Sequence, residues 1–179
     1  NEKGFVSYHQ DAKYIGLEPH NWVTAWVALT DSNENNGCMK MWPKSHLNIK
    51  DHNEKFNKGN LLTRGQTVEN VPDEEIKSIE LKAGQMSLHH PRVVHGSGIN
   101  RSNDRRIGFV IQSYIGTNVK QTLGKNSVQV ARGEDKYNHH EVIKRNNNLM
   151  SEESILLRKK ENYYLQEIFY KGAKQKGSY

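Results

Sequence analysis

The sequence predicts a mainly β fold, a barrel or jelly roll that is followed by one C-terminal helix. Before Gly116, apolar residues come in short runs that alternate with polar residues and end at Gly, Pro, Asn or Asp, as in strands joined by turns. Helical spacing of apolar residues is nearly absent there and becomes clear only after residue 150. The 179 residues are enough to bury one hydrophobic core, so we expect one such domain.

The strand pattern is clearest in residues 21–32, which we expect to form one long strand. Successive side chains of a strand point to opposite faces, so Trp22 and Trp26 share one face and Val23 and Val27 share the other. The remaining expected strands lie in residues 4–11, 38–43, 76–84, 85–91, 93–98 and 105–114.

The other segments set the expected division of the chain. Residues 47–76 hold few apolar anchors and are expected to form a long insertion loop. Residues 151–170 have helical apolar spacing, and Ser151 is a suitable N-cap that is followed by two glutamates. We therefore expect a core over residues 1–115, interrupted by the insertion, and an extension over residues 116–179 that contains the helix.

Composition excludes several classes of protein. The net charge is +6, but the lysines and arginines are scattered and form no basic stripe with stacking aromatics, so we expect no nucleic-acid partner. A basic surface of this kind is either simply solvated or attracts small anions. No apolar run approaches the ~20 residues that span a bilayer, and Cys38 has no partner for an internal disulfide. These features favour a cytoplasmic protein without a membrane partner.

A possible metal site begins at His9 and Asp11. If both lie on one strand, their side chains point the same way and place an imidazole beside a carboxylate. A second, distant histidine would complete two imidazoles and one carboxylate, which is the facial triad of non-haem iron(II) oxygenases. Candidates are His89, His90 and His95. A His-x-Asp pair alone is weak, since polar residues at a core edge often have this spacing.

An arginine strengthens the hypothesis. Arg106 follows His95 by eleven residues and lies in the next expected strand. Its guanidinium can bind the distal carboxylate of a 2-oxo diacid through two hydrogen bonds. On that strand Gly108 would share the face of Arg106 and leave room for a ligand, while Ile107 and Phe109 would point the other way into the core.

Five motifs follow one another in residues 5–114: "HQDAKY", "VTAWVAL", "NNGCMKMWPKSHL", "LKAGQMSLHHPRVVHGSGINRS" and "DRRIGF". In this order they resemble the phytanoyl-CoA dioxygenase-like Fe(II)/2-oxoglutarate-dependent oxygenases. The resemblance implies a double-stranded β-helix, a jelly-roll or cupin-like barrel, with the catalytic core in residues 1–115. It also implies a hydroxylase that consumes 2-oxoglutarate and O2 and releases succinate and CO2.

The resemblance also implies the roles of individual residues. His9, Asp11 and His95 would be the catalytic Fe(II) ligands. Arg106 would bind the 2-oxoglutarate cosubstrate, and Trp26 would form a wall beside it.

The segments "NLLTRGQ" and "GQMSLHH" resemble the branch that hydroxylates small organophosphonates such as 2-aminoethylphosphonate. The expected substrate is therefore small, polar and anionic. The candidate substrate contacts are Lys13, Tyr14, Arg64 and His90. For His90 an ordinary role as a hydrogen-bonded strand residue stays open.

The sequence departs from the family at two points and leaves rival functions open. Lys44 stands where the family usually has glycine, and the first helices and strands of the family domain are not in this sequence, so we expect a chain that enters the fold partway. A halogenase would need Gly or Ala in place of Asp11, which argues for hydroxylation. A non-catalytic metal- or ligand-binding β-barrel and a zinc hydrolase remain alternatives, although in a hydrolase Arg106 would have no role.

Overall fold

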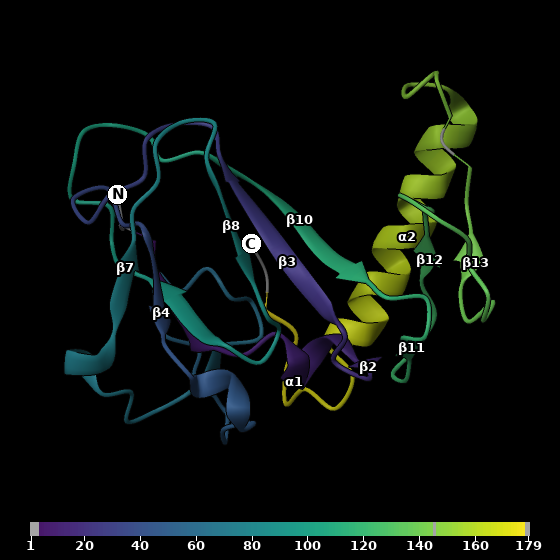
Figure 1. The fold of residues 1–179 in the computed structure, drawn as a ribbon. Helices are drawn as coiled ribbons and strands as arrows, with labels where there is room; N and C mark the ends of the chain where they lie inside the picture. Colours follow the sequence, from purple (N-terminus) through teal and green to yellow (C-terminus); the bar gives the residue numbers. More distant parts are fainter. Residues whose placement is uncertain (1–3, 145, 178–179) are drawn as a thin grey trace.

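The computed structural model describes residues 4–144 and 146–177, and the expected mainly β fold is confirmed (Figure 1). One sheet has the order β1 (Val6–His9), β9 (Val94–Ser97), β4 (Met39–Trp42) and β7 (Lys77–Ile79). A second sheet has the order β10 (Gly108–Ile115), β3 (Trp22–Ala28) and β8 (Met86–His89). All neighbouring strands in these sheets are antiparallel. The chain passes repeatedly from one sheet to the other, as in a jelly roll.

Strand β3 carries the alternation that its sequence predicts. Trp22, Thr24, Trp26 and Ala28 are buried, whereas Val23 and Val27 on the other face are more exposed and only the small Ala25 between them is buried. Thr24 lies opposite His89 of β8, and the His89 ring contacts a ring of β9 in the other sheet. The face of β3 that holds Thr24 and Trp26 is therefore the inner face, which is turned toward the four-stranded sheet.

The expected core position of Phe109 and Ile107 is wrong. Phe109 is 58% exposed and Ile107 is 38% exposed. Phe109 pairs with Val27, so it lies on the outer face of its sheet, together with the exposed Met86 and Leu88. The alternation of residues placed Ile107 and Phe109 on the opposite face from Gly108 correctly. It could not show which of these two faces packs against the rest of the protein.

The expected strand over residues 4–11 is also too long. Strand β1 ends at His9, and Asp11 has helical backbone angles, φ −58° and ψ −39°, at the start of the short helix α1 (Ala12–Ile15). The Asp11 carbonyl accepts hydrogen bonds from Tyr14 and Ile15, which turns the chain away from the sheet. Gly16 then ends α1 in the left-handed conformation, φ 69°.

The insertion and the C-terminal extension contact each other. Helix α2 (Glu152–Phe169) occupies the region in which a helix was expected, and the Ser151 side chain accepts a hydrogen bond from the Ser154 backbone N–H as its N-cap. Arg64 of the insertion donates to the carbonyl oxygens of Phe169 and Lys171 at the other end of α2. None of the described helices is long and apolar enough to cross a membrane.

Short elements complete the fold. Strand β2 (Leu17–Glu18) pairs with β11 (Lys120–Gln121), and a small core of Leu17, Trp22 and Val119 lies beside this pair. The others are η1 (Ser45–Leu47), β5 (Asn53–Glu54), β6 (Gln66–Thr67), η2 (Asp73–Glu75), β12 (Ser127–Val128) and β13 (Glu141–Val142).

Candidate metal centre

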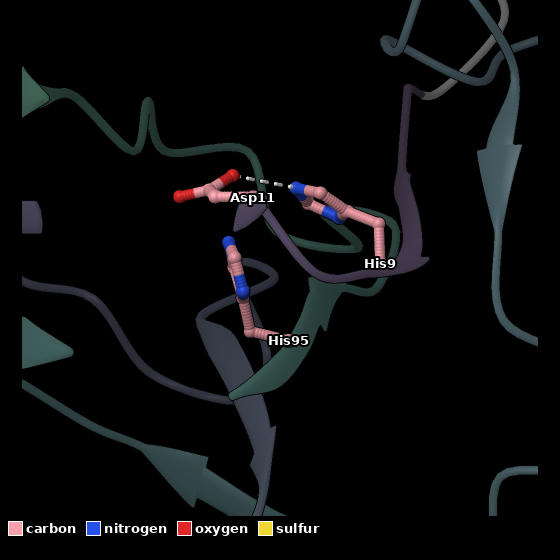
Figure 2. A group of neighbouring side chains, drawn as sticks. All are labelled: His9, Asp11 and His95. Carbon is pink, nitrogen blue, oxygen red and sulfur yellow. Dashed lines mark ion pairs between the residues drawn. The ribbon is translucent and has the colours of Figure 1, made fainter. Parts of the chain in front are cut away.

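Three side chains with metal-binding atoms converge between the two sheets. His9 ends β1, Asp11 is the N-cap that precedes α1, and His95 lies in β9, directly opposite His9. One ligand atom from each residue lies within 4.8 Å of the others, and all three residues are less than a tenth exposed. Figure 2 shows the two imidazoles and the carboxylate pointing toward one another. His9 and Asp11 are two positions apart in the sequence, and the fold brings His95, which is 84 positions after Asp11, to the same place.

Backbone carbonyls fix the two imidazoles in the form that binds a metal. His9 Nδ1 lies 2.9 Å from the Ser7 carbonyl oxygen, and His95 Nδ1 lies 3.1 Å from that of Val93. A carbonyl oxygen can only accept a hydrogen bond, so each Nδ1 carries the hydrogen. Each Nε2 therefore presents a lone pair, and a hydrogen bond of this kind from the other ring nitrogen is usual for metal-binding histidines.

The charges of the cluster also suit a cation. Burial by itself would raise the pKa of Asp11, but the neighbouring His9 and His95 outweigh burial and hold this pKa below its usual range. Burial lowers the pKa of His95 to about 3. At neutral pH the cluster therefore offers an anionic carboxylate and a neutral imidazole, which are the forms that bind metals. Thr24 Oγ1 donates to Asp11 Oδ2 at 3.4 Å and orients the carboxylate.

Gln10, between the two ligands of the His-x-Asp pair, anchors them. Its side chain is fully buried and donates to the carbonyl oxygens of Asn48, at 2.9 Å, and Arg92, while its Oε1 accepts from the Lys50 backbone N–H at 2.7 Å. The Gln10 backbone N–H donates to His52 Nε2 at 3.0 Å. The loop after η1 therefore holds the backbone that carries both His9 and Asp11.

Arg106 and Trp26 lie on the same inner face as the cluster. The Arg106 guanidinium carbon is 5.5 Å from the centre of the Trp26 ring, and partial burial lowers the pKa of Arg106 from its usual value. Gly108 permits this arrangement, because a Cβ there would lie 2.1 Å from the Trp26 ring. Trp26 is two residues from Thr24, which contacts Asp11, so the metal cluster, Trp26 and Arg106 follow one another along one face of β3.

The expected substrate contacts are dispersed. Lys13 is exposed on α1. Tyr14 is only 5% exposed, and its ring packs against the His52 ring and the Arg64 guanidinium. Burial there raises the pKa of the Tyr14 hydroxyl. Arg64 Nε donates to Glu54 at 2.8 Å, and the same guanidinium binds the end of α2. The Arg64 guanidinium is thus part of the packing of the fold.

The contacts of His90 are with residues outside the cluster of metal-binding atoms. Its Nδ1 accepts a hydrogen bond from the Arg92 backbone N–H, and its ring lies 5.7 Å from that of His46. It lines a hollow of about 400 Å³ with His20 and Trp22.

Sequence reasoning missed one residue beside the metal cluster. His89 is 5% exposed, and its ring centre lies 4.8 Å from that of His95. From the sequence, His89 is one of three candidate histidines, and the family resemblance gives the role of metal ligand to His95. The sequence shows only that His89 and Ser87 are two residues apart and therefore share one face of an expected strand. The pairing of β8 with β3 in the structure is needed to identify that face as the inner one.

Comparisons with known proteins agree with this geometry. The sequence model described as phytanoyl-CoA dioxygenase matches residues 1–108. A phytanoyl-CoA dioxygenase of Arabidopsis thaliana is 34% identical over 107 residues, which are 59% of this chain and 37% of that protein. A probable alpha-ketoglutarate-dependent hypophosphite dioxygenase of Stutzerimonas stutzeri is 30% identical over 122 residues, which are 66% of this chain and 42% of that protein.

A solved structure extends the similarity to the C-terminal part. The apo form of ThoJ, described as a non-heme monooxygenase, is similar with a TM-score of 0.81 and 27% identity over 95% of this chain and 62% of that one. The present chain therefore spans about two fifths of the length of the two curated relatives and about three fifths of this structural neighbour.

Proposed function

The chain belongs to the phytanoyl-CoA dioxygenase family, and we propose that it is the catalytic part of an Fe(II)- and 2-oxoglutarate-dependent dioxygenase that hydroxylates a small molecule. The observation that carries the proposal is the convergence of one ring nitrogen each of His9 and His95 and an Asp11 carboxylate oxygen within 4.8 Å. Two histidines and one carboxylate on one side of a metal are the donor set of non-haem Fe(II) oxygenases, and they leave positions open for other ligands.

In this proposal His9, Asp11 and His95 hold the iron. Iron with 2-oxoglutarate and O2 supplies the oxidising chemistry, in which one oxygen atom enters succinate as CO2 leaves and the other becomes the hydroxyl of the substrate. The carbonyls of Ser7 and Val93 keep both imidazoles in the ligating tautomer. Burial of all three ligands excludes water from their side of the site.

Arg106 and Trp26 are proposed to bind the cosubstrate. The Arg106 guanidinium would pair with the carboxylate of 2-oxoglutarate that is farther from the metal. The Trp26 indole would pack against the guanidinium and the bound cosubstrate. Support comes from the shared inner face of Thr24, Trp26 and Gly108 and from the relative named as an alpha-ketoglutarate-dependent dioxygenase. The proposed catalytic core is residues 1–115, with residues 116–179 as an extension.

We propose a small, polar, anionic substrate of the organophosphonate kind. The net charge of +6 favours the binding of anions. One relative is named as a probable hypophosphite dioxygenase, and hypophosphite is a small phosphorus oxyanion. Lys13, which is exposed next to the ligand Asp11, is the proposed cationic contact. His90 is left out, because its contacts are with the Arg92 N–H and the His46 ring. Arg64 is left out, because its guanidinium is bound to Glu54 and α2, and Tyr14 is left out because it packs against Arg64.

The test is an anaerobic titration of the full chain with Fe(II) and 2-oxoglutarate. We expect a weak visible charge-transfer band from the chelated cosubstrate, and succinate and CO2 once O2 and aminophosphonates are added. Asp11→Ala should abolish the band, and Arg106→Ala should require at least tenfold more 2-oxoglutarate, whereas Arg105→Ala, a change at the exposed neighbouring arginine, should match the unmodified chain. A chain without the band, or a band that is unchanged in Asp11→Ala, contradicts the proposal.

A further inference from the structure

Two buried polar atoms on the inner face of β8 have no hydrogen-bond partner. They are Nδ1 of His89, a residue that is 95% buried, and Oγ of Ser87. A buried donor or acceptor without a partner destabilises the folded state, and such groups are rare unless a water or ligand satisfies them. Two of them on one face of one strand therefore indicate a bound polar molecule.

The register of the sheet places these atoms along the proposed cosubstrate site. His89 lies opposite Thr24, which hydrogen-bonds the ligand Asp11, and the His89 ring lies against that of His95. His89 is therefore level with the metal cluster.

Ser87 lies one step farther along the same face. It is opposite Trp26, over which the Arg106 guanidinium is placed. Ser87 is therefore level with the proposed arginine clamp, and cross-strand partners share a face of the sheet. A dicarboxylate that reaches from the metal to Arg106 passes His89 first and Ser87 second.

We propose that His89 and Ser87 are two further cosubstrate-binding residues. The Nδ1–H of His89 donates to the carboxylate of 2-oxoglutarate that is nearer the metal. The Ser87 hydroxyl donates to the distal carboxylate, beside Arg106. Both bonds have a charged acceptor and are therefore stronger than bonds between neutral groups. This assignment rests on the proposed function, since it needs the same metal and the same cosubstrate.

The test separates hydrogen bonding from ring packing. His89→Phe keeps an aromatic ring of similar shape but removes the donor, whereas His89→Asn places an amide N–H close to where Nδ1 stands. We expect His89→Phe to raise the Kd of 2-oxoglutarate about 10- to 100-fold, His89→Asn to recover most of this loss, and Ser87→Ala to raise the Kd severalfold. His139→Phe, a change at an exposed histidine of the extension, is the matched control.

The readout is the charge-transfer band during anaerobic titration of Fe(II)-loaded protein, with iron affinity measured separately in each variant. If iron binding is retained and His89→Phe binds 2-oxoglutarate within twofold of the unmodified chain, the assignment is overturned. If His89→Phe loses iron, His89→Ala takes its place and the same criterion applies. If the unmodified chain itself gives no band, the proposed function fails and the assignment falls with it, which is distinct from a failure confined to the variants.

Discussion

Replacing Gln10 by leucine tests whether the residue between the two proposed ligands holds the metal site in place. Leucine has a similar volume, but it can neither donate to the carbonyls of Asn48 and Arg92 nor accept from the Lys50 N–H. Because Gln10 is fully buried, leucine adds no exposed apolar surface to the folded protein. The change therefore removes hydrogen bonds from the interior and does little else.

The expected loss of stability follows from the groups that are left behind. A buried polar group that loses its partner costs about 1–3 kcal/mol. The Lys50 N–H and the carbonyls of Asn48 and Arg92 are only partly buried, so at the lower end of that range, about 1–1.7 kcal/mol each, they together cost about 3–5 kcal/mol. That is a large part of the ~5–15 kcal/mol that stabilises a typical domain. For a chain of this size, 1 kcal/mol shifts Tm by about 2–4 °C, so Gln10→Leu should lower Tm by about 6–20 °C.

Thermal unfolding of the metal-free chain, followed by circular dichroism, measures this change. The matched control is Gln129→Leu, because Gln129 is exposed, and it should stay within about 2 °C of the unmodified chain. Metal titration is the second readout, and it should show weaker binding in Gln10→Leu because both His9 and Asp11 adjoin the loosened residue. A Tm and a metal affinity that both equal those of the unmodified chain would refute the anchoring role.

Three further predictions concern other parts of the fold. Arg64→Met removes the guanidinium that binds Glu54 and the end of α2, so we expect a loss of about 3 kcal/mol and earlier hydrogen exchange in α2; unchanged exchange there would contradict the coupling. Burial lowers the pKa of His52 to about 4, so the unfolded chain, with a histidine pKa of about 6.5, takes up the proton first as pH falls. The Tm of the metal-free chain should therefore fall as the pH is lowered from 6.5 to 4, and His52→Gln should make this dependence of Tm on pH less steep. An equally steep dependence in His52→Gln and the unmodified chain would contradict the role of His52. Gly108→Ala places a Cβ 2.1 Å from the Trp26 ring, so we expect at least tenfold weaker 2-oxoglutarate binding and altered tryptophan fluorescence, while the control Gly98→Ala, where a Cβ meets nothing within 4 Å, should change neither.

The strands could be predicted from the sequence because their signal is local. Alternation alone placed Trp22, Thr24 and Trp26 on one face of β3, and that face is buried. The covering of a face depends on distant segments, which is why Phe109 was expected in the core and is exposed. Pairing in the sheets is also long-range, so the position of His89 beside His95 had no local signal.

The sequence could predict which residues would form the candidate metal site, but not the backbone geometry that brings them together. The argument for His9 and Asp11 assumed that both lie on a strand, whereas the strand ends at His9 and Asp11 is the N-cap of α1. The two side chains still converge, because the buried Gln10 side chain and the turn at Ala12, whose N–H donates to the Pro91 carbonyl, redirect the backbone between them. The residue type at the middle position therefore matters as much as the spacing.

The histidines show why sequence cannot separate ligands from supports. His9, His52 and His95 each place Nδ1 within hydrogen-bond distance of the carbonyl oxygen two residues earlier, so the same local contact selects the same tautomer in all three. They differ only in what meets Nε2. In His52 this atom already accepts the Gln10 backbone N–H, while in His9 it lies 3.5 Å from Asp11 Oδ1, and a ring nitrogen of His95 lies in the same cluster. A histidine becomes a proposed ligand here because a distant segment leaves its second nitrogen without a donor, and this property exists only in the folded chain.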